Sequence, residues 1–142
     1  MIKALLVGSA VIVVTMLLAA VLFEIAGQAL RRVDMLMGRR SRPMQTLAVL
    51  IIALFWILLV LTLSVWSWAG VYIYIGLFDK LETALYFAIV SFTTVGYGDV
   101  VIDEHWRLLA GMTATNGLLV FGLFTAFLVE ILDVVRFRQR HR

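Results

Sequence analysis

The sequence has no cysteine among its 142 residues, and only 15% of them carry a charge. The first absence excludes disulfide bonds, thiolate metal sites and lipid anchors on cysteine. The second, together with 63% hydrophobic residues and a mean hydropathy of +1.05, excludes a soluble domain of this length. The two histidines, His105 and His141, are isolated, so we expect no metal site on them. The composition therefore indicates a membrane protein.

Three runs without charge cover residues 4–23, 43–78 and 108–129. About 20 apolar residues make a helix that crosses a hydrocarbon core of roughly 30 Å, so the first and last runs each predict one spanning helix. The middle run is too long for one helix and too short for two. We expect a spanning helix over residues 44–68, followed by an uncharged outer segment. The predicted fold class is an all-α membrane protein with three transmembrane helices.

The first run resembles the start of a secretory signal peptide, since Lys3 precedes it. A signal-peptide core is usually about 7 to 15 residues long and leads to a cleavage site of small residues. This run is longer and leads into Phe23-Glu24-Ile25, so we expect a retained helix. Apolar residues continue beyond it at roughly helical spacing, which predicts an amphipathic extension at the cytoplasmic interface. They are Ile25, Ala29, Val33, Leu36 and Met37.

Most arginines form two clusters, one between the first two spanning helices and one in the tail. Basic residues stay on the cytoplasmic side, and both clusters share that side if two further crossings separate them. The amino terminus is then outside, the carboxyl terminus is cytoplasmic, and the expected location is the plasma (inner) membrane. The clusters are Arg31, Arg32, Arg39, Arg40 and Arg42, and Arg136, Arg138, Arg140 and Arg142. The linker arginines set topology alone or also bind anionic lipid headgroups. Nucleic-acid binding is not expected, because both clusters adjoin hydrophobic spans.

Residues 81–92 read LETALYFAIVSF, a short stretch compatible with a helix. At about 1.5 Å per residue this helix reaches roughly 18 Å, so it enters the membrane and must return. The returning segment, residues 93–99, reads TTVGYGD. Non-helical backbone at membrane depth must be buried in protein or line an aqueous cavity. Gly96 and Gly98 allow positive φ, which lets successive carbonyls point to one side and coordinate a dehydrated cation.

Residues 93–99 resemble the selectivity filter of potassium channels, in which four such loops supply the oxygens that replace the hydration shell of K⁺. The resemblance covers about residues 44–135 and includes FGLFTA at 121–126, which is similar to the inner helix of simple bacterial two-helix channels. It implies a pore domain over 44–135. An N-terminal transmembrane helix with an Arg-rich linker would occupy 1–43, and a basic cytoplasmic tail would occupy 136–142.

The resemblance also implies a homotetramer, because each chain supplies only one of the four filter loops. K⁺ would be the permeant ion, and no cofactor would be needed. The implied filter residues are Thr94, Val95, Gly96, Tyr97 and Gly98, and the ion sites are the carbonyls of Thr94 to Tyr97 with the Thr94 hydroxyl. The short helix would aim the negative end of its dipole at the central cavity. Tyr97 would point away from the pore onto Tyr86 and Phe87, with Thr93 and Asp99 as further supports.

Asp99 lies just outside this filter. In some relatives the equivalent carboxylate is held through a glutamate on the short helix, but Val90 occupies that position here. We expect the Tyr86 hydroxyl to replace the glutamate as the partner of Asp99. The alternative, which stays open at this point, is a solvated Asp99 that faces extracellular cations.

The last spanning helix carries the other implied pore residues. Positions that match the cavity are Leu118, Phe121 and Thr125, and the candidate hinge glycines are Gly117 and Gly122. Asn116, beside the hinge, is costly in hydrocarbon and should face protein or the cavity. It is therefore a cavity candidate whose two interpretations are a hydrogen bond between helices and a contact with an ion.

The inner end of the same helix holds three gate candidates, Val129, Glu130 and Asp133. A fourfold ring of Asp133 carboxylates would attract K⁺ when the pore is open. The carboxylates would repel one another when it is closed, which raises some of their pKa values and would make opening sensitive to pH. The alternative is an ordinary surface pair of Asp133 with Arg136.

The resulting prediction is a potassium-selective channel that conducts K⁺ passively and is not an enzyme. Residues 96–99 also match the GxGD motif of intramembrane aspartyl proteases, but that chemistry requires a second aspartate in a facing helix. The three uncharged runs contain none. A weakly selective or non-conducting subunit, modulated by a partner, is the remaining alternative, and Tyr97 favours selectivity over it. No helix has arginine at every third position, which excludes a voltage sensor.

Overall fold

The chain folds into long helices in the computed structural model, which describes the backbone of residues 2–37 and 43–140 and the side chains of 2–29, 32 and 47–133. The elements are α1 (Ile2–Met37), α2 (Pro43–Tyr74), α3 (Leu81–Phe92), the 3₁₀ turn η1 (Glu104–Trp106) and α4 (Arg107–Arg140). Three segments are long and apolar enough to cross a membrane: Ile2–Ala29, Leu47–Tyr74 and Glu104–Asp133. The predicted all-α class with three transmembrane helices is confirmed.

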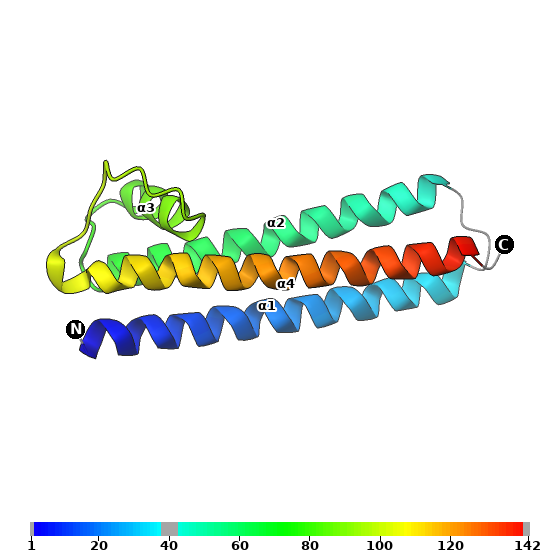
Figure 1. The fold of residues 1–142 in the computed structure, drawn as a ribbon, viewed down its shortest axis with the longest axis horizontal. Helices are drawn as coiled ribbons and strands as arrows, with labels where there is room; N and C mark the ends of the chain where they lie inside the picture. Colours follow the sequence, from blue (N-terminus) through cyan, green and yellow to red (C-terminus); the bar gives the residue numbers. More distant parts are fainter. Residues whose placement is uncertain (1, 38–42, 141–142) are drawn as a thin grey trace.

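The three long helices lie side by side, and each packs against the other two (Figure 1). The short helix α3 and the loop that follows it lie at one end of this bundle, the end that also holds the amino terminus (Figure 1). The carboxyl terminus and the start of α2 lie at the opposite end (Figure 1). The glycine-rich loop therefore lies at the end of the bundle opposite to the carboxyl ends of α1 and α4 (Figure 1).

The expected extents of α3 and α1 agree with the structure, whereas the expected end of α2 does not. The short helix α3 covers residues 81–92 as expected, and α1 continues through Met37, so its predicted extension is confirmed as a helix. The expected end of α2 near residue 68 was wrong, because the helix continues to Tyr74. Trp68 and Tyr72 are fully buried, and their packing stabilises the additional turns.

Gly76 ends α2 in a defined way. Its φ is 73°, its N–H donates to the Ile73 carbonyl at 3.0 Å, and the N–H of Leu77 donates to the Tyr72 carbonyl at 2.9 Å. This pair of bonds is the Schellman arrangement, which satisfies the last carbonyls of a helix and needs a left-handed residue at the position of Gly76. The turn redirects the chain toward the start of α3.

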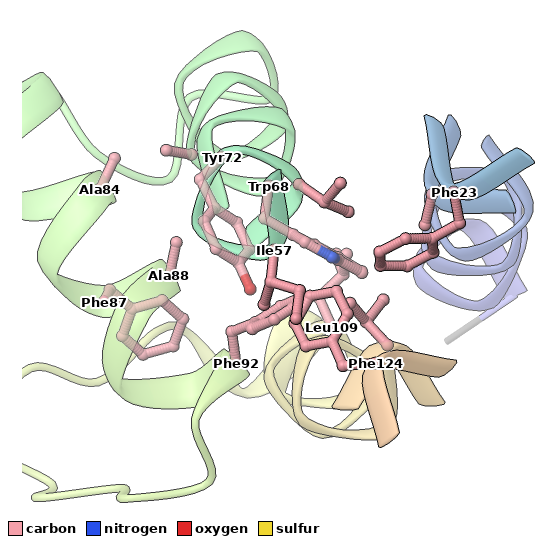
Figure 2. Packing of buried hydrophobic residues seen from close by; sticks show 14 of the residues in the cluster. Phe23, Ile57, Trp68, Tyr72, Ala84, Phe87, Ala88, Phe92, Leu109 and Phe124 are labelled. Carbon is pink, nitrogen blue, oxygen red and sulfur yellow. The ribbon is translucent and has the colours of Figure 1, made fainter. Parts of the chain in front are cut away.

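An aromatic cluster joins α2 to α3 and α4. The Tyr72 ring packs edge-on against Phe87 at 5.3 Å between centroids, and its hydroxyl lies 2.5 Å from Thr113 Oγ1 of α4. Figure 2 shows Tyr72 between α3 and α4 at the centre of the buried residues. These contacts set the position of α3 along the long helices.

A second set of contacts attaches α1. The Phe23 ring packs against Phe124 at 5.4 Å and Phe127 at 4.5 Å, both on α4. The indole N–H of Trp56 on α2 donates to the Leu22 carbonyl of α1 at 2.9 Å. The helix α1 is thus packed against both α2 and α4 and is an integral part of the bundle.

Candidate functional site

In the loop after α3, residues with positive φ alternate with residues whose φ is not positive. Thr94, Gly96 and Gly98 have φ values of 62°, 58° and 77°, whereas the φ values of Val95 and Tyr97 are not positive. In an ordinary strand successive carbonyls point in opposite directions, and a change in the sign of φ at every second residue brings them to one side. Glycine adopts this conformation without a Cβ penalty. The loop therefore has the backbone that a row of aligned carbonyls requires.

Thr94 is the exception to glycine in this pattern. Among the described residues it is the non-glycine residue with positive φ, and it is β-branched, which makes the conformation unfavourable. Such strain persists only where surrounding structure enforces it, and it gathers at functional sites. The sequence placed Thr94 in the filter, but only the structure identifies it as strained.

Hydrogen bonds to the end of α3 enforce the loop conformation. The N–H groups of Val95 and Gly96 both donate to the Val90 carbonyl, at 3.0 and 3.2 Å, and the N–H of Thr94 donates to the Ser91 carbonyl at 3.0 Å. In a trans peptide the carbonyl of one residue points opposite to the N–H of the next. The carbonyls of Thr94 and Val95 therefore point away from α3, where an ion could reach them.

Large apolar side chains of the loop and along one side of α4 are exposed in the single chain. Tyr97 is 72% exposed and Val95 is 51% exposed. Leu118, Phe121 and Val129 on α4 are 62%, 39% and 51% exposed, and with Thr125 they follow the spacing of one helix face. An exposed apolar face of this kind is suited to contact with further copies of the chain or to lining a pore.

Asp99 accepts a hydrogen bond from Tyr86. The Tyr86 hydroxyl donates to Asp99 Oδ2 at 2.6 Å, so the predicted pairing is confirmed. This hydrogen bond lowers the pKa of the Asp99 carboxyl from its ordinary value of 3.8, with a smaller opposing effect from desolvation. The contact joins the outer end of the loop back to α3, so the loop is attached to this helix at both of its ends.

We predict that Tyr86→Phe makes the loop less resistant to acid. Because the pKa of Asp99 is lowered in the folded state, its stabilising effect is present above pH 3.8 and is lost as the pH falls through the lower native value. Without the tyrosine hydroxyl, acid inactivation of ion flux should have its midpoint at a higher pH. Tyr74→Phe, at a tyrosine that is 89% exposed on α2, is the control and should leave the midpoint unchanged. Equal midpoints in both variants would contradict the role.

The other expected supports of Tyr97 lie differently. Phe87 is buried and packs against Tyr72 and Phe78, each at 5.3 Å between ring centroids. Its side of α3 faces α2, because Tyr72 lies near the end of α2 and Phe78 follows that helix. Figure 2 shows Phe87 beside Tyr72. Within one chain Phe87 is therefore not free to brace Tyr97, which is exposed. Thr93 continues the end of α3, where its hydroxyl donates to the Ile89 carbonyl at 2.7 Å.

Gly117 brings α4 against the end of α3. A Cβ at this position would lie 1.8 Å from the carbonyl oxygen of Phe92, the last residue of α3. No side chain fits at such a distance, so glycine is required for the two helices to approach. The sequence suggested a hinge here, and the structure adds a packing reason for the same residue. Gly122, the other hinge candidate, has open space beside its Cα, and a methyl group there would meet nothing within 4 Å.

Asn116 does not lie with the other cavity candidates. It is fully buried, and its Nδ2 donates to Thr15 Oγ1 of α1 at 2.7 Å. Leu118 and Phe121 are exposed on a different side of α4. The structure therefore favours the interpretation of Asn116 as a hydrogen-bonding residue between helices.

The gate candidates at the inner end of α4 also separate. Val129 and Asp133 are exposed and one helical turn apart, so they share a side of α4. Glu130 instead lines a cleft between α1 and α4 together with Glu24. The Arg136 side chain lies outside the described residues, as do the side chains of the basic clusters apart from Arg32, which is exposed.

Several residues that hold the site were not found from the sequence. Thr15, Trp68, Tyr72 and Thr113 are fully buried, and each belongs to an uncharged run. Hydroxyl groups in a membrane helix commonly bond to carbonyls of their own helix, so their presence alone does not point to a partner.

Three helices long and apolar enough to span a membrane, with a short apolar helix and a loop of alternating φ at one end, are the arrangement expected of an ion channel. The model of the ion channel family matches residues 46–133, well over half of the chain. The chain therefore belongs to this family of ion channels, and it is a channel of the membrane and not an enzyme. Channels of this kind need no cofactor.

One curated relative is similar over part of its length. The chain is 38% identical over 68 residues to the Two pore potassium channel a of Oryza sativa subsp. japonica. The aligned segment covers 44% of this chain and 20% of the rice protein, so the chain spans about one fifth of that relative. No solved structure matches the chain.

Proposed function

We propose that four copies of this chain form a potassium-selective channel that conducts K⁺ passively through the loop at residues 94–98. The observation that carries the proposal is the alternation of φ at Thr94, Gly96 and Gly98. In each copy the carbonyls of Thr94, Val95, Gly96 and Tyr97 would coordinate dehydrated K⁺, and the Thr94 hydroxyl would complete the innermost site. The name of the rice relative, a potassium channel, supports the choice of ion.

A single loop cannot surround an ion, and this is the reason for a homotetramer. The exposed side of α4 that bears Leu118, Phe121 and Thr125 would line the cavity below the filter. The exposed Tyr97 would pack on a neighbouring copy, since Phe87 of its own chain faces α2. Four copies around one axis form a closed symmetric assembly, which satisfies every subunit in the same way.

The proposed orientation places the amino terminus and the filter outside and the basic clusters in the cytoplasm. The filter loop lies at the end of the bundle opposite to the carboxyl ends of α1 and α4, which supports this orientation (Figure 1). The excess of arginine at one end agrees with the usual retention of basic segments on the cytoplasmic side. The carboxyl end of α3 would then point toward the central cavity, where its dipole favours a cation.

Ion flux from proteoliposomes tests the function. Vesicles loaded with K⁺ and diluted into a K⁺-free buffer should release K⁺ when a proton carrier balances the charge, whereas vesicles loaded with Na⁺ should release little. Equal release of both ions would support the alternative of a weakly selective subunit, and release of neither would support a non-conducting one. Cross-linking of the purified protein, with a largest product of four chains, tests the assembly separately.

The proposal also includes an anionic lipid as a partner at the cytoplasmic end. An apolar cavity of about 160 Å³ lies between the long helices there, lined by Ala26, Ala29, Val49, Ile52, Ala53, Trp56, Phe127 and Ile131. Apolar cavities of similar size, about 150 Å³, bind small hydrocarbons. An acyl chain in this cavity would carry a headgroup within reach of the bundle end where Arg32 is exposed.

We predict that Ala53→Leu, which fills the cavity, reduces the number of anionic phospholipids that remain bound to the purified protein in native mass spectrometry. Arg32→Gln should lower the preference for phosphatidylglycerol over phosphatidylcholine several-fold and leave total lipid binding nearly unchanged. Ala10→Leu, at an exposed position of α1 that does not line the cavity, is the control for added volume. Unchanged lipid retention in Ala53→Leu would show that the cavity does not bind the lipid.

A further inference from the structure

Among the fully buried side chains that carry polar atoms, one from each long helix is of interest in the apolar interior. They are Thr15 of α1, Trp68 of α2 and Asn116 of α4. The Thr15 hydroxyl donates to carbonyls of its own helix, those of Val11 at 2.8 Å and Ile12 at 3.0 Å, and accepts from Asn116 Nδ2 at 2.7 Å. Thr15 is thus satisfied, and it links α1 to α4.

The other two side chains each keep one group without a partner. Asn116 Oδ1, an acceptor, and Trp68 Nε1, a donor, are the buried side-chain nitrogen and oxygen atoms among the described residues that have no hydrogen-bond partner. More than nine in ten buried polar groups in proteins are paired with protein or ordered water. A donor and an acceptor that are both unpaired in one apolar core therefore require an explanation.

The helix register brings the two groups to the same height. The bond between Tyr72 and Thr113 aligns α2 with α4, and the two helices run in opposite directions (Figure 1). Trp68 on α2 and Asn116 on α4 each lie about one helical turn, or about 5.4 Å, farther from the filter loop than Tyr72 and Thr113. Figure 2 shows the Trp68 indole nitrogen pointing into the space between α1 and α4. The bond between Asn116 and Thr15 joins the same two helices, α1 and α4.

We propose that one buried water accepts from Trp68 Nε1 and donates to Asn116 Oδ1, so that Thr15, Trp68, Asn116 and the water form a polar junction of the three spanning helices. A water is held well when two to four polar groups surround it, and it supplies both functions that the two orphaned groups lack. The water would satisfy both groups, since it accepts a hydrogen bond from the indole N–H of Trp68 and donates one to Asn116 Oδ1.

The junction gives the additional helix α1 a role toward the filter. Thr15 lies outside the residues that the family model matches, 46–133. Asn116 precedes Gly117, whose backbone lies against the Phe92 carbonyl at the end of α3. A shift of α1 would therefore move α4 where it supports the helix that holds the filter loop. We assign Asn116 as a positioning residue for the filter.

Nuclear magnetic resonance of the purified full chain, deuterated and labelled with ¹⁵N at tryptophan, tests the water directly. The indole N–H of Trp68, assigned by its loss in Trp68→Phe, should show a cross-relaxation peak to a long-lived water, and Asn116→Leu should remove that peak. A Trp68 indole without a water peak, or a peak that survives in Asn116→Leu, would overturn the proposed bridge. This readout does not depend on ion conduction, so it stands apart from the proposed function.

The positioning role rests on the proposed function and is measured by selectivity. Thr15→Val and Trp68→Phe should each lower the ratio of K⁺ to Na⁺ flux several-fold per assembled channel, and Thr15→Ser, which keeps the hydroxyl, should restore it. Ser64→Ala is the matched control, because Ser64 is equally buried but, among the described residues, bonds within its own helix, to the Val60 carbonyl at 2.9 Å. Variants that change the yield of folded protein but keep the flux ratio would reduce the junction to a stabilising role.

Discussion

Gly117→Ala should prevent the chain from forming a functional channel, because the added Cβ would lie 1.8 Å from the Phe92 carbonyl oxygen. A contact with backbone cannot be relieved by a rotamer change, so α4 must move away from α3. Overpacking of this kind typically costs about 1–3 kcal/mol and sometimes more, and in the proposed tetramer every copy would carry the same clash. We expect a loss of stability of at least about 3 kcal/mol per chain and a fall in K⁺ flux of tenfold or more.

The control for this variant is Gly111→Ala on the same helix. Nothing lies within 4 Å of a Cβ at Gly111, so the substitution should be neutral or stabilise the helix by about 0.5–1 kcal/mol. The comparison also distinguishes packing from a hinge. If Gly117 acted only as a hinge, Gly117→Ala would fold and assemble normally and would fail only in opening. Thermal unfolding followed by tryptophan fluorescence, together with flux per assembled channel, separates these outcomes.

Gly96→Ala should abolish K⁺ selectivity while the protein still folds. Gly96 has a φ of 58° and open space around its Cα, so the effect comes from backbone conformation and not from a clash. A left-handed conformation costs alanine about 1–2 kcal/mol relative to glycine. Relief of that strain would rotate the peptide and turn a carbonyl away from the ion path. We expect the ratio of K⁺ to Na⁺ flux to fall at least tenfold.

Gly70→Ala provides the matched control on α2. This glycine also has open space, but it lies within a helix, where alanine is favoured by roughly 0.5–1 kcal/mol. Selectivity should be unchanged and unfolding slightly more difficult. A Gly96→Ala channel as selective as the Gly70→Ala channel would show that the positive φ at residue 96 is not required for discrimination.

Features that depend on neighbouring residues were predicted well. The short helix at residues 81–92 and the return loop follow from the length of an apolar stretch and from glycine at alternate positions. The Tyr86–Asp99 bond was also predicted, because both residues flank the same loop. The expected end of α2 near residue 68 was wrong because helix length there depends on the burial of Trp68 and Tyr72 by other helices.

The sequence alone determined that this chain is a membrane protein with three spanning helices and a filter-like loop, because run length, charge placement and a seven-residue motif are local properties. Only the tertiary structure decided why Gly117 must be glycine and which partner Asn116 has. Those answers depend on contacts with Phe92 and Thr15, which are far away in the chain. Helix periodicity indicates which side of a helix a residue occupies, but the identity of the neighbour on that side is set by how the helices pack.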